Sequence, residues 1–184
     1  TAAMVKANGY GLGSGAVATA LAAAGCALFF VASLGEAIEL RRHFKKVGIN
    51  EMPIMVLHGA QIGQEDALAA NQLVPVLNDL EQISRWRLFA NKIGMTLPAL
   101  LHFDTGMTRL GLDVDQADWL IQNRGALDGL YIDYVMSHLV SGEVADDPVN
   151  ARQLASFNEL RSWFAGVPAS LANSAGCLLG NDYH

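Results

Sequence analysis

Residues 1–33, TAAMVKANGYGLGSGAVATALAAAGCALFFVAS, have the pattern of one strand–helix–strand unit. The apolar runs Ala2–Lys6 and Leu28–Ser33 have the length and composition of buried strands, and the Ala-rich segment Ser14–Ala24 between them predicts a helix. Gly25 follows that helix, where glycine commonly takes the left-handed conformation that ends a helix. Because two parallel strands need a crossover of about this length, the unit predicts a parallel pair.

The same alternation continues along the chain. Helix-like segments separate five further apolar runs of strand length, which are 53–57, 73–77, 99–103, 130–137 and 169–172. Seven strands alternating with helices favour a parallel sheet of the α/β class. Ser33 with Glu36, and Asn78 with Glu81, have the spacing of capping boxes that begin helices. The basic run 41–46 predicts a solvated helix end.

A polar residue ends or follows each predicted strand. These residues are Lys6, Ser33, His58, Asn78, Asp104, His138 and the pair Asn173-Ser174. Because the carboxyl ends of parallel strands lie at one edge of a sheet, the pattern is typical of the active-site end of a (β/α)8 barrel. Seven strands are one short of closure, and the chain starts within a strand and stops at His184 without a final helix. We therefore expect a barrel that is truncated at both ends.

Composition excludes several classes of protein. The chain has 184 residues, of which 52% are hydrophobic and 16% charged, which suits one globular domain. A net charge of −6 argues against binding to nucleic acid or to an anionic membrane surface. Cys26 and Cys177 have no metal-ligand or disulfide spacing. The uncharged stretch 7–34 is interrupted by glycines, so we expect neither a membrane span nor a signal peptide. We expect a cytoplasmic protein without a metal site.

The first candidate for chemistry is Lys6. A lysine beside apolar residues at a strand end is partly desolvated, which lowers the pKa of its amine and makes it a nucleophile. A solvated surface lysine is the simpler interpretation. The glycines in 11–16, GLGSGA, nearly match a dinucleotide-binding fingerprint, with Glu36 at the distance of a ribose contact.

The second candidate is the segment 102–111, HFDTGMTRLG. A single Asp-Thr-Gly in an α/β pattern argues against an aspartic protease, which needs two such carboxylates. Asp104 could simply bind the amides of a turn, while Arg109 could recognise a carboxylate or phenolate with its planar guanidinium. Further along, His138 could fill the core or lie under a cofactor ring, and Asn173-Ser174 could cap a helix or bind phosphate at its N-terminus.

Three motifs, in this order, resemble those of bacterial alanine racemases, and the resemblance covers the whole chain: VKANGYG at 5–11, FDTGMTRLG at 103–111 and ANSA at 172–175. It implies that 1–184 is an incomplete N-terminal (β/α)8 barrel domain, that a C-terminal β domain lies outside this sequence, and that the full protein is a homodimer. It also implies pyridoxal 5'-phosphate as cofactor and alanine as substrate.

The same resemblance assigns roles to individual residues. Lys6 would hold the cofactor as an aldimine and act as one catalytic base, and Tyr10 and Ser174, with Asn173 beside it, would bind the phosphate. Arg109 would meet the substrate carboxylate and the ring phenolate, and His138 would stack on the ring. His102 stands where several relatives carry a lysine that becomes carbamylated, so the support of Arg109 differs here.

The implied reaction interconverts L- and D-alanine, either for peptidoglycan or for alanine breakdown. Two bases on opposite faces of Cα are needed, and the second would be a tyrosine of the partner chain's β domain. We therefore expect residues 1–184 alone to be nearly inactive. The alternatives are another fold type III pyridoxal-phosphate enzyme, such as a serine or broad-specificity racemase, a dinucleotide-binding enzyme, and a non-catalytic interaction module.

Overall fold

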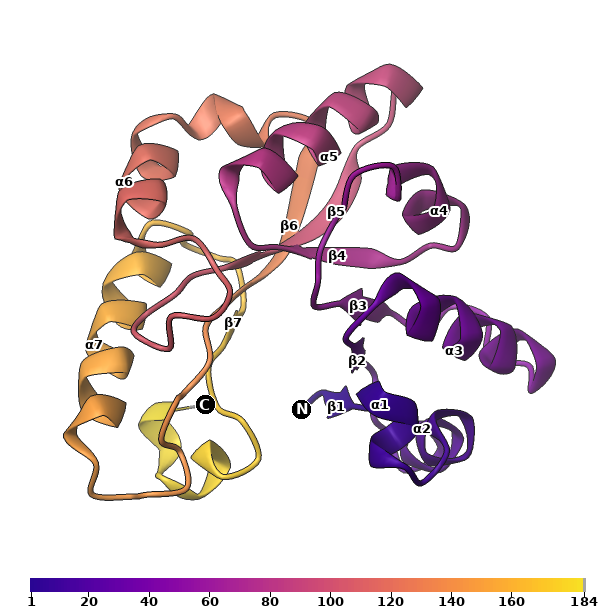
Figure 1. The fold of residues 1–184 in the computed structure, drawn as a ribbon, viewed down its shortest axis with the longest axis horizontal. Helices are drawn as coiled ribbons and strands as arrows, with labels where there is room; N and C mark the ends of the chain where they lie inside the picture. Colours follow the sequence, from indigo (N-terminus) through magenta and orange to yellow (C-terminus); the bar gives the residue numbers. More distant parts are fainter. Residues whose placement is uncertain (184) are drawn as a thin grey trace. The chain divides into compact units, whose positions relative to one another are not determined.

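A computed structural model describes residues 1–183, which form two compact units, Thr1–Val76 and the residues from Leu77 onward. Figure 1 shows the helices and strands of both. All seven strands expected from the sequence are present, and the pairings described within each unit are parallel and follow chain order. The predicted α/β class is therefore confirmed.

The first unit contains, in chain order, β1 (Ala3–Met4), α1 (Lys6–Tyr10), α2 (Ser14–Ala23), β2 (Phe29–Val31), α3 (Leu34–Lys46), β3 (Ile54–Val56), α4 (Glu65–Ala70) and β4 (Val74–Leu77), whose last residue begins the second unit. Phe29 of β2 lies opposite Ala3 on one side and Ile54 on the other. Phe29 also packs edge-on against Phe44 of α3, with ring centroids 5.3 Å apart, so this helix is fixed to the sheet by buried aromatic contact.

The second unit contains α5 (Leu80–Ile93), β5 (Leu97–His102), α6 (Val114–Gln122), η1 (Arg124–Leu127), β6 (Leu130–Met136), α7 (Pro148–Ser162), β7 (Ala169–Ser170) and the short 3-10 turns η2 (Gly176–Leu178) and η3 (Asn181–Tyr183). Trp86 of α5 is fully buried, and its indole N–H donates to the carbonyl oxygen of Pro98 in β5 at 3.0 Å. The last residue of β5, His102, is opposite Met136 of β6.

The helix starts test two predicted capping boxes. The box at Ser33 and Glu36 is confirmed at the start of α3. The second prediction is wrong by one residue, because Asp79 caps α5 by accepting from the Gln82 N–H at 2.7 Å. Asn78 is buried, and its side chain forms a hydrogen bond with His102.

The basic run 41–46 is only partly the solvated helix end that its composition predicts. Arg41 is 2% exposed and donates to the carbonyl oxygens of Met52, Asn71 and Gln72 at 2.7–3.0 Å. Burial lowers the pKa of this guanidinium. Arg41 thus ties α3 to the segments that precede β3 and follow α4.

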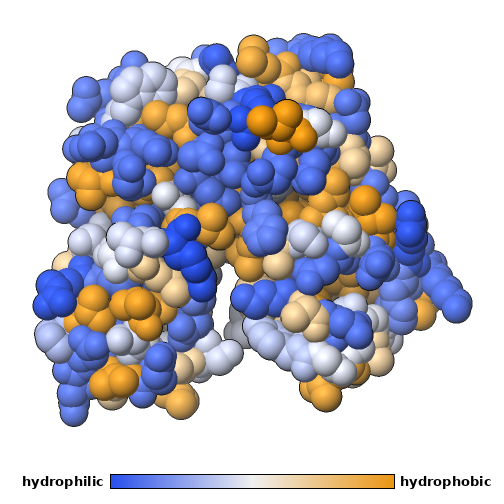
Figure 2. All heavy atoms as spheres, in the orientation of Figure 1, coloured by the Kyte–Doolittle hydropathy of each residue, from blue (hydrophilic) through white to orange (hydrophobic). Residues whose placement is uncertain are grey.

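On the face drawn in Figure 2, hydrophobic residues are scattered among hydrophilic ones and do not gather into one large patch. Such scattered apolar residues are normal on a folded protein. In residues 1–183, no helix combines the length and the apolar character needed to cross a bilayer.

Candidate functional site

Lys6 lies two residues after the end of β1 and begins α1, a short turn whose following residues have a left-handed backbone. Ala7, Asn8, Gly9, Tyr10 and Gly11 all have positive φ, from 50° to 88°. The left-handed conformation costs an L-residue roughly 1–2 kcal/mol, and it normally occurs in single residues. A run of this kind must therefore be held by contacts from outside it. Within the turn, Tyr10 is 62% exposed and Lys6 is half-buried.

Two side chains hold this left-handed turn. The Glu36 carboxylate accepts from the Ala7 N–H at 2.8 Å through Oε1 and from the Ala32 N–H at 2.7 Å through Oε2. Asn8 Oδ1 accepts from the N–H of Ser14, the first residue of α2, at 3.0 Å. The predicted ribose contact of Glu36 is therefore wrong, because its carboxylate is committed to backbone amides.

The segment after β5 forms a loop built around one aspartate. Asp104 Oδ1 accepts from the backbone N–H groups of Gly106, Met107 and Thr108 at 2.9–3.0 Å. This confirms the interpretation of Asp104 as a residue that binds the amides of a turn. Gly111 closes the loop, since a Cβ there would lie 2.7 Å from the Asp104 nitrogen.

His102 supports the base of this loop. It is 6% exposed, and its Nδ1 lies 2.8 Å from Asn78 Oδ1. An amide oxygen only accepts, so the contact requires the proton on Nδ1 and leaves Nε2 unprotonated in the neutral ring. Burial lowers the pKa of His102 to about 4, with smaller contributions from the charges of His138 and Arg109, which lower it, and of Asp104, which raises it. His102 is therefore neutral at pH 7 and close to these three groups.

The backbone after β6 is fixed by Gln153 of α7. Its Nε2 donates to the His138 carbonyl oxygen at 2.9 Å, and its Oε1 accepts from the Val140 N–H at 2.9 Å. The hydroxyl groups of Thr105 and Ser137 are 2.7 Å apart, which joins the loop after β5 to the end of β6. His138 is thus held in place through its backbone.

Asn173 and Ser174 follow β7. Asn173 Oδ1 accepts from the Gly176 N–H at 2.8 Å, and Nδ2 donates to the Leu139 carbonyl oxygen at 3.3 Å. The expected helix here is wrong, because the residues that Asn173 caps form only a short 3-10 turn. Ser174 is exposed at the start of that turn.

Several predicted site residues differ from their neighbours in the hydrogen bonds that their side chains form. In residues 1–183, the side chains of Lys6, Tyr10, Arg109 and Ser174 form no hydrogen bond or ion pair. Their neighbours Glu36, Asn8, Asp104 and Asn173 are instead occupied with backbone amides and carbonyls. Sequence reasoning missed the supporting roles of Asn8, Glu36, Asn78 and Gln153. The capping-box spacing had singled out Glu36 and Asn78, but for helix caps and not for these contacts.

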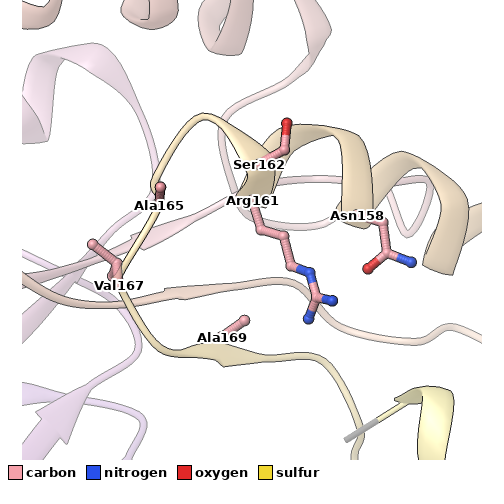
Figure 3. A pocket seen from close by; sticks show the side chains of 6 residues that line it. All are labelled: Asn158, Arg161, Ser162, Ala165, Val167 and Ala169. Atoms are coloured by element: carbon pink, nitrogen blue, oxygen red, sulfur yellow. The ribbon is translucent and has the colours of Figure 1, made fainter.

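A separate cavity of about 440 Å³ lies beside the end of α7 (Figure 3). Its lining residues are Asn158, Arg161, Ser162, Ala165, Val167 and Ala169. Of these only Arg161 is charged, and none is a predicted site residue. The cavity is therefore distinct from the groups described above.

Comparison with known proteins gives one consistent result. The family model described as "Alanine racemase, N-terminal domain" matches residues 1–184. The alanine racemase of Brucella abortus (strain 2308) is 46% identical over 100% of this chain and 46% of its own length. That of Rickettsia typhi (strain ATCC VR-144 / Wilmington) is 44% identical over 99% of this chain and 44% of its own length. The chain thus spans about half the length of these curated relatives.

Solved structures agree with the sequence comparison. The alanine racemase from Bartonella henselae with covalently bound pyridoxal phosphate has a TM-score of 0.92 and 37% identity, over 100% of this chain and 52% of that chain. The biosynthetic alanine racemase from Pseudomonas aeruginosa has a TM-score of 0.79 and 30% identity, over 100% and 49%. The predicted fold class is confirmed as that of the N-terminal barrel domain, and the dinucleotide-binding alternative is wrong. This chain belongs to the alanine racemase N-terminal domain family.

Proposed function

We propose that this chain provides the cofactor-binding part of an enzyme that interconverts L- and D-alanine with pyridoxal 5'-phosphate. Family membership and relatives named alanine racemase support the reaction. The observation that carries the proposal is the division of the site residues. Lys6, Tyr10, Arg109 and Ser174 have unbonded polar groups, while adjacent carboxylates and amides hold the backbone that carries them.

These unbonded groups fit the cofactor by their chemistry. The Lys6 amine would hold the aldehyde carbon of the cofactor, and the hydroxyl groups of Tyr10 and Ser174, together with Asn173, which precedes Ser174 in the chain, would bind its phosphate. The ring of His138 would lie against the pyridine ring. When bound, pyridoxal phosphate draws electron density from the substrate Cα and so makes the Cα proton acidic.

The chain's own residues would then manage the proton and the substrate. Racemisation removes the Cα proton from one face and returns a proton to the other. The Lys6 amine would accept the proton on the D-alanine side, and general acid–base catalysis of this kind contributes about 10²–10⁴-fold. Arg109 would bind the substrate carboxylate through two parallel N–H donors and so fix which face of Cα meets Lys6.

The second base would be a tyrosine from the partner chain of a homodimer, and we propose a cytoplasmic location for the reaction. D-Alanine for peptidoglycan and alanine breakdown are both uses of this chemistry. A serine or broad-specificity racemase would share Lys6 and the cofactor, and turnover of a panel of amino acids separates these cases.

Borohydride trapping tests the role of Lys6. The purified protein is mixed with pyridoxal phosphate, reduced, and mapped by peptide mass spectrometry. We expect the adduct on Lys6, visible absorbance before reduction, and loss of both in Lys6→Ala. Lys45→Ala, at an exposed position of α3, is the matched control and should label as the unsubstituted protein does. An adduct spread over the other lysines and unchanged in Lys6→Ala would refute the proposal.

A further inference from the structure

We propose that Glu36 is a positioning residue for Lys6, because its carboxylate holds the left-handed turn that starts at the next residue. The inference rests on the proposed function of Lys6 as the cofactor-binding amine. It assigns to Glu36 a second task besides capping α3, which is to set the direction in which the Lys6 side chain leaves the backbone.

The amides on both sides of Lys6 are fixed, but in different ways. The Val5 N–H donates to the Phe30 carbonyl oxygen at 2.9 Å, a backbone contact of the β1–β2 pair that no side-chain substitution removes. The Ala7 N–H donates to Glu36 Oε1 at 2.8 Å. The second of these constraints therefore depends on a single carboxylate, 29 residues away in the sequence.

Glu36 is itself held rigidly. It is the third residue of α3, whose Ala37, Leu40 and Phe44 are buried against the sheet. Its Oε2 accepts from the Ala32 and Ser33 N–H groups at 2.7 and 3.3 Å, which fixes the carboxylate at the end of β2. The turn after Lys6 is thus bonded to a side chain that has little freedom to move.

The turn needs such a partner because its conformation is unfavourable. Ala7, with φ 50° and ψ 47°, is an L-residue with a Cβ in the left-handed region, and Asn8 follows in the same conformation. Hydrogen bonds to an ionised carboxylate are roughly twice as strong as neutral ones. Backbone bonds from the Gly9 N–H to the Val5 carbonyl oxygen and from the Gly11 N–H to the Ala7 carbonyl oxygen, both at 3.0 Å, remain when that carboxylate is lost. The Ala7 N–H itself then loses its acceptor, so we expect Ala7 to shift toward the conformations that alanine prefers and to turn the backbone next to Lys6.

The test uses Glu36→Gln, which keeps the shape of the side chain but removes its charge and places an NH₂ group among amide donors. Ser33→Ala is the matched control, because it removes the α3 cap contact at 3.4 Å and leaves the Ala7 bond intact. Glu36→Asp, with the charge on a side chain one methylene shorter, is the second variant if Glu36→Gln does not fold. Thermal unfolding is recorded for each protein.

Two labelling reactions report on Lys6. Pyridoxal phosphate with borohydride measures cofactor capture, and limiting acetic anhydride measures the intrinsic reactivity of the amine, each normalised to Lys92 of α5. In Glu36→Gln we expect both Lys6 ratios to change, with cofactor capture reduced about tenfold, the effect of losing one charge-assisted hydrogen bond. Ser33→Ala should stay within about twofold of the unsubstituted protein, because it removes only a helix cap and leaves the bond between Glu36 and the Ala7 N–H intact.

A rescue variant separates positioning from simple stability. Glycine adopts the left-handed conformation without the penalty that alanine pays. Ala7→Gly in the Glu36→Gln background should therefore restore much of the Lys6 capture, whereas loss of the α3 cap would not be repaired by a change at residue 7.

The outcomes are distinct. A Glu36→Gln protein that unfolds at lower temperature but labels Lys6 at the original ratio overturns the inference. Failure of Ala7→Gly to restore capture also counts against it. If the unsubstituted protein takes up no pyridoxal phosphate at Lys6 while Glu36→Gln still alters the acetylation ratio, the proposed function fails and the positioning role stands.

Discussion

At the scale of single residues, each unit uses one carboxylate to hold the backbone of a segment that carries a predicted site residue. Glu36 accepts from three backbone amides in the first unit, and Asp104 accepts from three in the second. Backbone N–H groups in irregular loops must find acceptors, and a carboxylate supplies several at once. Lys6 and Arg109 therefore lie next to backbone N–H groups that a carboxylate binds.

His102 makes stability depend on pH in the acid range. Its pKa is about 4 in the folded protein and about 6.5 when unfolded, so the unfolded chain binds more protons between these values. Stability is complete above about pH 6.5 and falls as the pH drops toward 4, by about 3 kcal/mol in total. Urea unfolding between pH 7 and 4 should show this loss, and His102→Gln should show correspondingly less.

Other groups also titrate in this pH range, and they contribute to the pH dependence of stability in both the unsubstituted protein and His102→Gln. Asp147, whose pKa is lowered mainly by the hydrogen bond from the Val149 N–H, also loses its stabilising effect on acidification. Only the difference between the two proteins reports on His102. Identical pH slopes for the unsubstituted protein and His102→Gln would contradict the assignment.

At the scale of elements, helices α2 and α3 approach closely through a glycine. A Cβ on Gly15 would lie 2.6 Å from the His43 ring, and that ring is hydrogen-bonded through Nε2 to Thr19 Oγ1 at 2.8 Å. Gly35, at the start of α3, has only the Ser33 hydroxyl at 4.0 Å from such a Cβ. Replacing glycine by alanine would therefore cause a clash at residue 15 in α2 but not at residue 35 in α3.

We expect Gly35→Ala to stabilise the protein by about 0.5–1 kcal/mol, the usual gain of alanine over glycine in a helix. Gly15→Ala should destabilise it by about 1 kcal/mol, because displacing His43 and losing its bond to Thr19 outweighs that gain. Chemical unfolding of the two variants measures the difference. Stabilisation by both substitutions would show that α2 and α3 have room to separate.

The elements themselves could be predicted from the sequence because their signals are local. Apolar runs located all seven strands, and Ser33 with Glu36 located the start of α3. The contacts that build the site could not be predicted, because they join residues that are distant in the sequence. Examples are the bonds of Glu36 to Ala7 and of Asn78 to His102. Asn78 and Asp79 are both good caps; the Asn78 side chain bonds to His102, and Asp79 caps α5. Arg41 looked solvated for the same reason, because its three carbonyl partners come from other segments.

At the scale of the whole molecule, the chain spans 46% of the length of its Brucella abortus relative. The resemblance places one base, Lys6, inside this sequence and the second outside it. Two opposed bases are required for racemisation, and each contributes about 10²–10⁴-fold. We therefore expect purified residues 1–184 to form D-alanine at least about 100-fold more slowly than a full-length relative.

A coupled assay for D-alanine measures this directly, with the full-length Brucella abortus enzyme as the positive control and Lys6→Ala as the blank. Circular dichroism confirms that the protein assayed is folded. Turnover comparable to that of the full-length enzyme would show that both bases lie within residues 1–184.

The placement of Glu36 and Arg41 on one helix has a consequence for protein engineering. Glu36 binds the turn after Lys6, and Arg41, five residues further along α3, binds the segments around β3 and α4. Grafting only the VKANGYG motif onto another scaffold would transfer the amine without its support. The shortest segment that contains Lys6, Glu36 and the carbonyl partners of Arg41 runs from β1 to residue 72, so Lys6 and the contacts that hold its turn would have to be transferred together.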